Sequence, residues 1–176
     1  MASVFEVKFD NKHGVAESTL MCASFSGAHF YNMESDVDLD NGSVSVLDVE
    51  NYKEDDVFMT AVPKVTDKIV LLLNPVKIYE DYMTQMQEEH FYFCKKGERI
   101  RAYEVYDTDR FSLSVEAFAA DAEPAVGKYV VVDGAGYKLT VVDEKPTGYG
   151  FIGKIIGQNA NGTYEIFVIR NRAVEA

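Results

Sequence analysis

The fold is decided by one run of apolar residues, Ile69-Val70-Leu71-Leu72-Leu73, which stops at Asn74 and Pro75. Polar and apolar side chains do not alternate in this run, so both faces of a strand formed here would have to be covered by the rest of the chain. We therefore expect a central strand of the core. A membrane-spanning helix needs about 18 apolar residues, and this is the longest apolar run, so the sequence predicts no transmembrane segment.

Segments with alternating apolar side chains predict further strands around this one. In Phe111-Ser112-Leu113-Ser114-Val115-Glu116-Ala117 every second residue is apolar, so one face is expected to be buried and the other solvated. Residues 5–9 and 163–168 alternate in the same way. Runs rich in β-branched and aromatic residues predict strands at 44–49, 57–62, 100–106, 128–132, 137–142 and 151–156. Short strands at this spacing are typical of a mainly β fold, either a sandwich or barrel-like.

Turns and one helix complete the expected fold. Asp133-Gly134-Ala135-Gly136 joins two strand-like runs and Asn161-Gly162 precedes another, which predicts two hairpin tips because positive φ angles cost glycine and asparagine little. One short helix is expected around residues 80–91, since apolar side chains share a face there at helical spacing. The residues on this face are Tyr79, Tyr82, Met83, Met86 and His90.

The chain has 176 residues, enough for one domain or for a main body with a small appended lobe. Residues 118–127 lack periodicity and contain Pro124 and Gly127, which makes them the best candidate for a linker. The sequence therefore predicts a main β-rich body at 1–120 and a small C-terminal β-subdomain at 121–176, unless the two form one continuous domain.

The net charge of -12 argues against a nucleic-acid partner, because binding to a phosphate backbone depends on clustered lysine and arginine. The charge is uneven: residues 1–90 carry 17 acidic and 6 basic side chains, and residues 91–176 carry 12 and 11. Either the first part has solvated acidic loops, or it presents a surface to a cation or a partner.

The N-terminal residues lack the basic start and apolar middle of a secretion signal, so we expect a cytoplasmic location before any assembly. The two cysteines, Cys22 and Cys94, are far apart in sequence, and neither belongs to a closely spaced pair. This spacing predicts reduced, buried thiols in place of a disulfide or a zinc site.

One acidic segment has the opening of a calcium loop. In Asp36-Val37-Asp38-Leu39-Asp40-Asn41-Gly42, carboxylates stand at alternate positions, but the glycine comes one residue late and Leu47 occupies the place of the bidentate acid. An acidic surface turn fits the segment better. Asp36, Asp38 and Asp40 are the metal candidates of this sequence, and weak ones.

No residue pattern predicts a catalytic centre or a bound cofactor, so we expect a protein that is not an enzyme. Gly148-Tyr149-Gly150-Phe151-Ile152-Gly153 matches the dinucleotide fingerprint in letters, but a strand-like run follows it where a helix is required, so these glycines are expected at tight bends or a bulge. Asp107 and Asp109 have the residue type of a glycosidase pair and stand in a predicted turn, which accounts for them.

Three stretches together resemble small head-accessory proteins encoded among the virion genes of tailed phages that infect Firmicutes. They are Val4-Phe5-Glu6-Val7-Lys8-Phe9, the turn Asp40-Asn41-Gly42, and Val126-Gly127-Lys128-Tyr129-Val130-Val131-Val132 with Ile152-Gly153-Lys154-Ile155-Ile156. The resemblance implies a capsid decoration or cement protein of the virion, with the phage major capsid protein as partner, homo-oligomers on the shell, and no catalytic residues.

Two functional hypotheses follow. In the first, the alternating strand with Phe5, Val7 and Phe9 adds to an exposed strand edge of the capsid. In the second, a β-sandwich module binds carbohydrate or another small ligand through its aromatic residues. The candidate aromatics cluster in and after the predicted helix, where core packing is the favoured use; they are Tyr79, Tyr82, Phe91, Tyr92 and Phe93.

Overall fold

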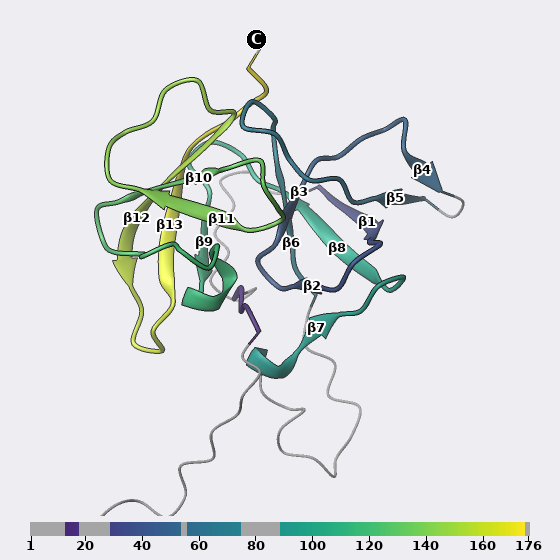
Figure 1. Ribbon diagram of the computed structural model, residues 1–176, viewed down its shortest axis with the longest axis horizontal. Helices are drawn as coiled ribbons and strands as arrows, with labels where there is room; N and C mark the ends of the chain where they lie inside the picture. The colour runs from purple at the N-terminus through teal and green to yellow at the C-terminus, as the bar shows by residue number, and fades with distance from the viewer. Residues whose placement is uncertain (1–12, 18–28, 54–55, 75–88, 175–176) are drawn as a thin grey trace, which may run out of the picture.

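The computed structural model of the protein describes residues 13–17, 29–53, 56–74 and 89–174. Within these ranges the chain forms three β-sheets and two single turns of 3-10 helix, which confirms the predicted mainly β fold (Figure 1). The strands are β1 (Phe30–Glu34), β2 (Leu39–Asp40), β3 (Val44–Ser45), β4 (Tyr52–Lys53), β5 (Val57–Met59), β6 (Val70–Leu72), β7 (Phe93–Cys94), β8 (Arg99–Glu104), β9 (Arg110–Leu113), β10 (Tyr129–Val132), β11 (Leu139–Val142), β12 (Phe151–Gln158) and β13 (Tyr164–Asn171). The 3-10 turns are η3 (Glu89–Phe91) and η4 (Val115–Ala117).

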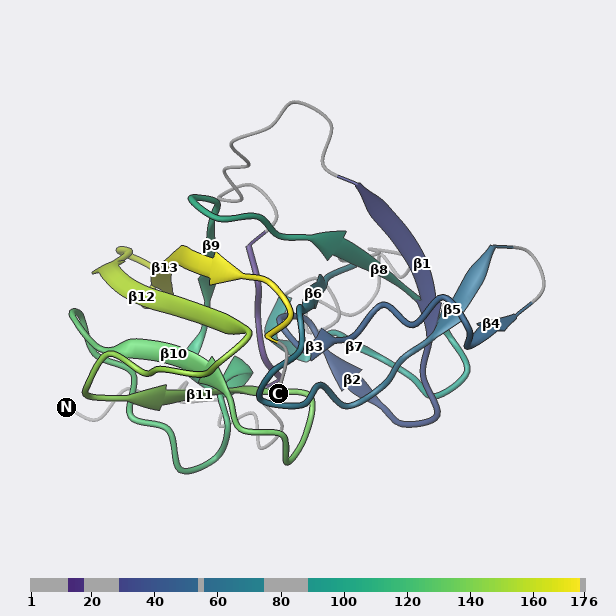
Figure 2. The same cartoon turned by 90° about the horizontal axis from the view of Figure 1, so that it is seen from above.

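The sheets are open and lie side by side in a sandwich-like arrangement, not a closed barrel. One sheet has six strands in the order β3-β6-β8-β1-β5-β4, the second has five in the order β11-β10-β12-β13-β9, and β2 and β7 form a small third sheet. Strand β5 runs parallel to β1, and the other pairs are antiparallel. Seen from above, β6 lies between the five-stranded sheet and the rest of the six-stranded sheet (Figure 2).

Strand β6 is the central strand that its sequence predicts. It pairs with β3 on one side and β8 on the other, and all residues from Ile69 to Leu73 are buried. Its two faces contribute to different cores. Ile69, Leu71 and Leu73 pack with residues of the five-stranded sheet, whereas Val70 and Leu72 pack with a smaller cluster. That smaller cluster also contains Met33, Leu39, Cys94, Ile100 and Ala102. The run at residues 69–73 is apolar at every position because each face of β6 packs into a different core.

The other predicted strands and turns are mostly confirmed. Each of the six ranges predicted from β-rich composition contains a strand. The β10–β11 and β12–β13 hairpins turn at Gly134 (φ +79°) and Gly162 (φ +88°). The glycine-rich run at 148–153 leads into antiparallel β12, and the register shifts between Ile152 and Gly153, which confirms the predicted bulge.

The prediction of one alternating strand over 111–117 is wrong in its second half. Strand β9 ends at Leu113, and the N–H groups of Ala117 and Phe118 then donate to the carbonyls of Ser114 and Val115, which closes η4. Val115 is consequently 48% exposed. Within β9 the prediction of a solvated face is also wrong. Ser112 is buried and accepts a hydrogen bond from the Asn159 amide at 3.1 Å.

Several predictions fall partly or wholly outside the described residues. The helix expected around 80–91 is described only from residue 89, where the chain makes the turn η3. Phe5, Val7, Phe9 and Cys22 also lie outside. Cys94 is a free, buried thiol.

Residues on both sides of the predicted linker share one sheet. Strand β9 precedes position 120, yet it pairs with β13, which follows it. Phe118 is buried in the larger core and makes an isolated parallel bridge to Leu139. The division at residue 120 stays a prediction about how the two parts fold.

Candidate functional site

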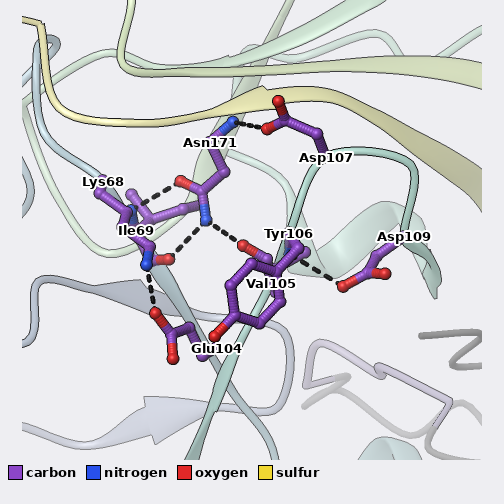
Figure 3. A network of polar contacts seen from close by, with 8 residues as sticks. All are labelled: Lys68, Ile69, Glu104, Val105, Tyr106, Asp107, Asp109 and Asn171. Carbon is purple, nitrogen blue, oxygen red and sulfur yellow. Dashed lines mark hydrogen bonds and ion pairs between the residues drawn. The ribbon is translucent and has the colours of Figure 1, made fainter. Parts of the chain in front are cut away.

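A buried asparagine joins the two large sheets. Asn171, at the end of β13, is 3% exposed. Its Oδ1 accepts a hydrogen bond from the N–H of Ile69 at 2.9 Å, and its Nδ2 donates to the carbonyls of Ile69 at 2.8 Å and Val105 at 2.6 Å (Figure 3). The amide therefore bonds to backbone beside β6 and β8, as a neighbouring strand would. Buried polar groups that are fully paired favour one packing arrangement over others.

The turn between β8 and β9 holds Asn171 from the other side. Asp107 Oδ1 accepts a hydrogen bond from the N–H of Asn171 at 2.9 Å, and Asp107 Oδ2 lies 2.5 Å from Nη2 of Arg172. Asp109 Oδ2 accepts from the N–H of Tyr106 at 2.8 Å. Both carboxylates thus bond to backbone groups, which agrees with the turn predicted for Asp107 and Asp109.

Thr108, inside this turn, has a left-handed backbone with φ +78°. A β-branched residue is strongly disfavoured there, because its side chain crowds its own backbone. The conformation is held by the hydrogen bond from the Thr108 N–H to the carbonyl of Val168 at 2.8 Å and by the Asp109 contact. Backbone strain of this kind persists only where surrounding contacts over-determine it.

A second polar group lies beside the turn. Lys68 Nζ forms an ion pair with Glu104 and lies 5.2 Å from the ring centroid of Tyr106. The hydrogen bond from Tyr106 to Glu104 raises the pKa of the Tyr106 hydroxyl to about 12. Burial raises the pKa of Glu104, but the hydrogen bonds from Lys68 and Tyr106 outweigh it, so this pKa lies below its ordinary value. Tyr106 therefore stays protonated and Glu104 stays ionised at neutral pH.

These residues line an open crevice where the two large sheets meet. Its lining residues include Lys68, Tyr106, Thr108 and Arg172, and its volume is about 650 Å³. A second hollow of about 520 Å³ adjoins it and shares Asp107 and Arg172 with it. The further residues of the second hollow are Lys145, Pro146, Thr147, Gly148, Ile152, Ile169 and Arg170. We call the two hollows together the seam crevice.

The seam crevice is cationic on a strongly acidic protein. Its charged lining residues are Lys68, Lys145, Arg170, Arg172 and one acid, Asp107. Glu104 pairs with Lys68, and Asp107 pairs with Arg172. Within the part of the chain that the structure describes, the side chains of Lys145 and Arg170 have no hydrogen-bond or ion-pair partner. Two cations are therefore available to an outside group.

The aspartates predicted as weak metal candidates do not share one site, because Asp38 and Asp40 bond to different partners in the chain. Asp38 Oδ1 accepts a hydrogen bond from the N–H of Lys96 at 2.8 Å. Asp40 lies 2.8 Å from Nδ1 of His13 and 2.8 Å from Nζ of Lys138. Burial raises the pKa of Asp40, but the hydrogen bonds from Lys138 and His13 outweigh it and lower this pKa. Asp36 is exposed. Across the described ranges, no group of three or more His, Cys, Asp or Glu side chains is placed to hold a metal ion.

An arm formed by β4 and β5 projects from the six-stranded sheet (Figures 1 and 2). Strand β4 is the edge strand, and no described strand pairs with its outer side. Two large apolar side chains are exposed on or before it, Val49 at 71% and Tyr52 at 53%. Open edges and exposed apolar side chains are features of surfaces that meet another chain.

Sequence reasoning missed the seam crevice. Its residues come from four separate segments, and Ile69 and Asn171 beside it are 102 positions apart. A first signal is the turn that contains Thr108, but turn chemistry explains this turn without a binding site. The basic side chains after residue 140 were a second signal, but their grouping depends on how β13 packs.

No helix in the described ranges is long and apolar enough to cross a membrane. Comparisons with known protein families, with curated protein sequences and with solved structures give no match.

Proposed function

We propose that this protein is a structural virion protein, a decoration or cement protein that binds the outside of a bacteriophage capsid and stabilises it. The observation that carries the proposal is the projecting β4–β5 arm, with an open strand edge and exposed Val49 and Tyr52 on a tightly bonded β body. The sequence resemblance to phage head-accessory proteins points the same way.

The use of polar groups supports a binding role over a catalytic one. In the described residues, every buried side-chain nitrogen or oxygen atom has a hydrogen-bond partner. The two polar clusters around Asp40 and Asn171 connect segments of the chain to one another. Such networks make a body rigid, and a rigid body loses little conformational entropy on binding.

A cement protein stabilises a shell by burying surface across capsid subunits. A standard protein interface buries about 1,600 Å² in total. An open edge such as that of β4 can supply backbone hydrogen bonds to a capsid strand. The strand predicted at Phe5, Val7 and Phe9 would add a second such contact. Many copies on one lattice then make modest individual contacts sufficient.

The test is co-sedimentation with heads of the phage that encodes the chain, after its own copies have been stripped away. We expect the added protein to pellet with the heads and to raise the temperature at which they rupture. Deletion of residues 1–9 should abolish this binding while far-UV circular dichroism stays unchanged. Protein that remains in the supernatant at saturating concentration would contradict the proposal.

The alternative is a module that binds carbohydrate or a small ligand, and the seam crevice is the feature that favours it. However, Lys68 covers one face of the Tyr106 ring, which leaves less of that ring free to stack on a sugar. A glycan array and a ligand-induced melting shift distinguish the two functions, because a sugar that binds and raises the melting temperature would favour the ligand-binding module.

A further inference from the structure

We propose that the seam crevice is a docking site for an extended acidic peptide segment of the partner, whose carboxylates bind Lys145 and Arg170. The inference rests on the proposed function in one respect, because it takes the partner to be a protein of the shell.

The positive charges of the crevice favour a negatively charged ligand. The whole chain carries -12, so its overall charge repels an acidic partner. Lys145 and Arg170 are unpaired within the described residues, and Asp107 is already neutralised by Arg172. Screening restricts these interactions to about 8 Å at physiological salt. A short acidic segment can therefore bind locally, whereas a long nucleic acid would meet the acidic surface as well.

The shape of the crevice selects an extended ligand. Its two hollows, of about 650 and 520 Å³, adjoin at Asp107 and Arg172. A single small anion would fill a minor part of this space. The hollow that holds the two cations is also lined by the apolar residues Pro146, Ile152 and Ile169. A mixed lining of this kind suits a peptide that carries both acidic and apolar side chains.

The walls of the crevice are already in place. The N–H of Gly150 donates to the carbonyl of Val65 at 2.8 Å, and the N–H of Arg172 donates to the carbonyl of Gly150 at 3.0 Å. The N–H of Val174 donates to the carbonyl of Thr66 at 2.9 Å. These bonds tie the β11–β12 connection and the chain after β13 to the segment before β6. A preformed site needs little rearrangement on binding.

The experiment measures fluorescence anisotropy of a fluorescein-labelled ten-residue peptide in which Glu and Ser alternate. A peptide of alternating Gln and Ser is the neutral control. The full-length chain should bind the acidic peptide and not the neutral one, and added salt should weaken the binding. Absence of binding to the acidic peptide at every protein concentration would overturn the proposal.

Two double variants with the same change in net charge separate the crevice from the overall charge. Lys145→Glu with Arg170→Glu should weaken peptide binding by at least about tenfold. Lys95→Glu with Lys96→Glu alters exposed lysines in the turn after β7, which do not line the crevice, and should change peptide binding less than about twofold. Equal losses in the two variants would refute a local site. Thermal unfolding of both variants checks that each is folded.

Other ligands are outcomes of the same test. Inorganic phosphate or an oligomer of galacturonic acid, titrated alone with a melting-shift readout, should have no effect that depends on Arg170. If they bind there and the peptide does not, the site takes small anions and the proposal fails.

Sedimentation velocity tests whether a second copy of this chain occupies the crevice. Self-association of the wild-type chain that is lost in the Lys145→Glu, Arg170→Glu variant would overturn the choice of partner.

Head binding separates this inference from the proposed function. The Lys145→Glu, Arg170→Glu variant should sediment with phage heads less than the wild-type chain does. Full head binding by the variant would overturn the docking site and leave the cement function standing. Wild-type protein that binds the acidic peptide but not the heads would overturn the cement function and leave the ligand chemistry of the crevice standing.

Discussion

The two ends of β6 are held by buried asparagines that connect it to different parts of the molecule. At its C-terminal end, the Asn41 side chain donates to the carbonyl of Asn74 and accepts from its N–H, both at 2.9 Å. The Asn74 side chain in turn donates to the carbonyl of Arg99 and accepts from the N–H of Arg101. At its N-terminal end, Asn171 bonds Ile69 from the other large sheet. The first contact keeps β6 in register beside β8, and the second joins two sheets.

The difference between the two ends of β6 indicates where a binding site can form in this molecule. The Asn74 side chain also donates to the Tyr92 hydroxyl at 3.1 Å, so its partners all belong to one segment, residues 92–101. The Asn171 end brings three distant segments together, and the seam crevice, the strained Thr108 and the unpaired cations all occur there. A junction between sheets leaves hollows that the interior of a single sheet does not.

The largest effect is expected at the Asn171 end from Gly150→Ala. A Cβ on Gly150 would lie 2.1 Å from the carbonyl oxygen of Asp67, and this oxygen belongs to backbone that cannot turn aside. We expect a loss of about 3 kcal/mol or more in the free energy of unfolding. Gly136→Ala is the control, because its Cβ would meet no atom within 4 Å. Urea denaturation measures both, and equal stabilities would show that the two segments are not in close contact.

Removing each asparagine tests the comparison itself. Asn171→Ala leaves backbone groups of Ile69 and Val105 unpaired in the interior, and we expect a loss of about 3 kcal/mol. Asn74→Ala should cost less, about 2 kcal/mol, because several of its side-chain partners are only partly buried and water can replace the amide. Denaturant titration gives both values. The reverse order would mean that the local register contact, not the junction, dominates stability.

A smaller effect of opposite sign is expected at Thr108. Thr108→Asn keeps the turn but replaces a β-branched residue with one that tolerates the left-handed backbone, so the protein should gain roughly 0.5–1 kcal/mol. The shift in melting temperature measures it. Thr60→Asn serves as control, because Thr60 has no positive φ. An unchanged or lower melting temperature for Thr108→Asn would show that this backbone is not strained.

The smallest expected effect is the contribution of Glu104 to the pH dependence of the free energy of unfolding. Its pKa is lower in the folded protein than its ordinary value of 4.5, so its contribution to stability is fully present above that value. The contribution is lost as the pH falls through the folded pKa. Glu104→Gln should therefore flatten the acid limb of a plot of unfolding free energy against pH below about 4.5. An acid limb with the same slope in both proteins would rule out this contribution.

Local patterns predicted the strands well and their ends poorly. The alternation in 111–117 continues through Val115 in the sequence, yet hydrogen bonds back to Ser114 and Val115 stop the strand. Asp36, Asp38 and Asp40 follow one another at ligand spacing, but Asp38 bonds Lys96 and Asp40 bonds Lys138, which are 58 and 98 positions away. Spacing along the chain does not reveal which distant partner competes for a side chain.

The amino-acid sequence alone determined that this protein is mainly β, that residues 69–73 are covered on both faces, and that glycine turns close the two C-terminal hairpins. These features depend on side-chain periodicity and local backbone preference, which act over a few residues. The tertiary structure alone decided that Asn171 bonds Ile69 across 102 positions and that unpaired Lys145 and Arg170 line one crevice. The physical reason is that a hydrogen bond or a hollow between sheets depends on how whole sheets pack, and no local preference encodes that arrangement.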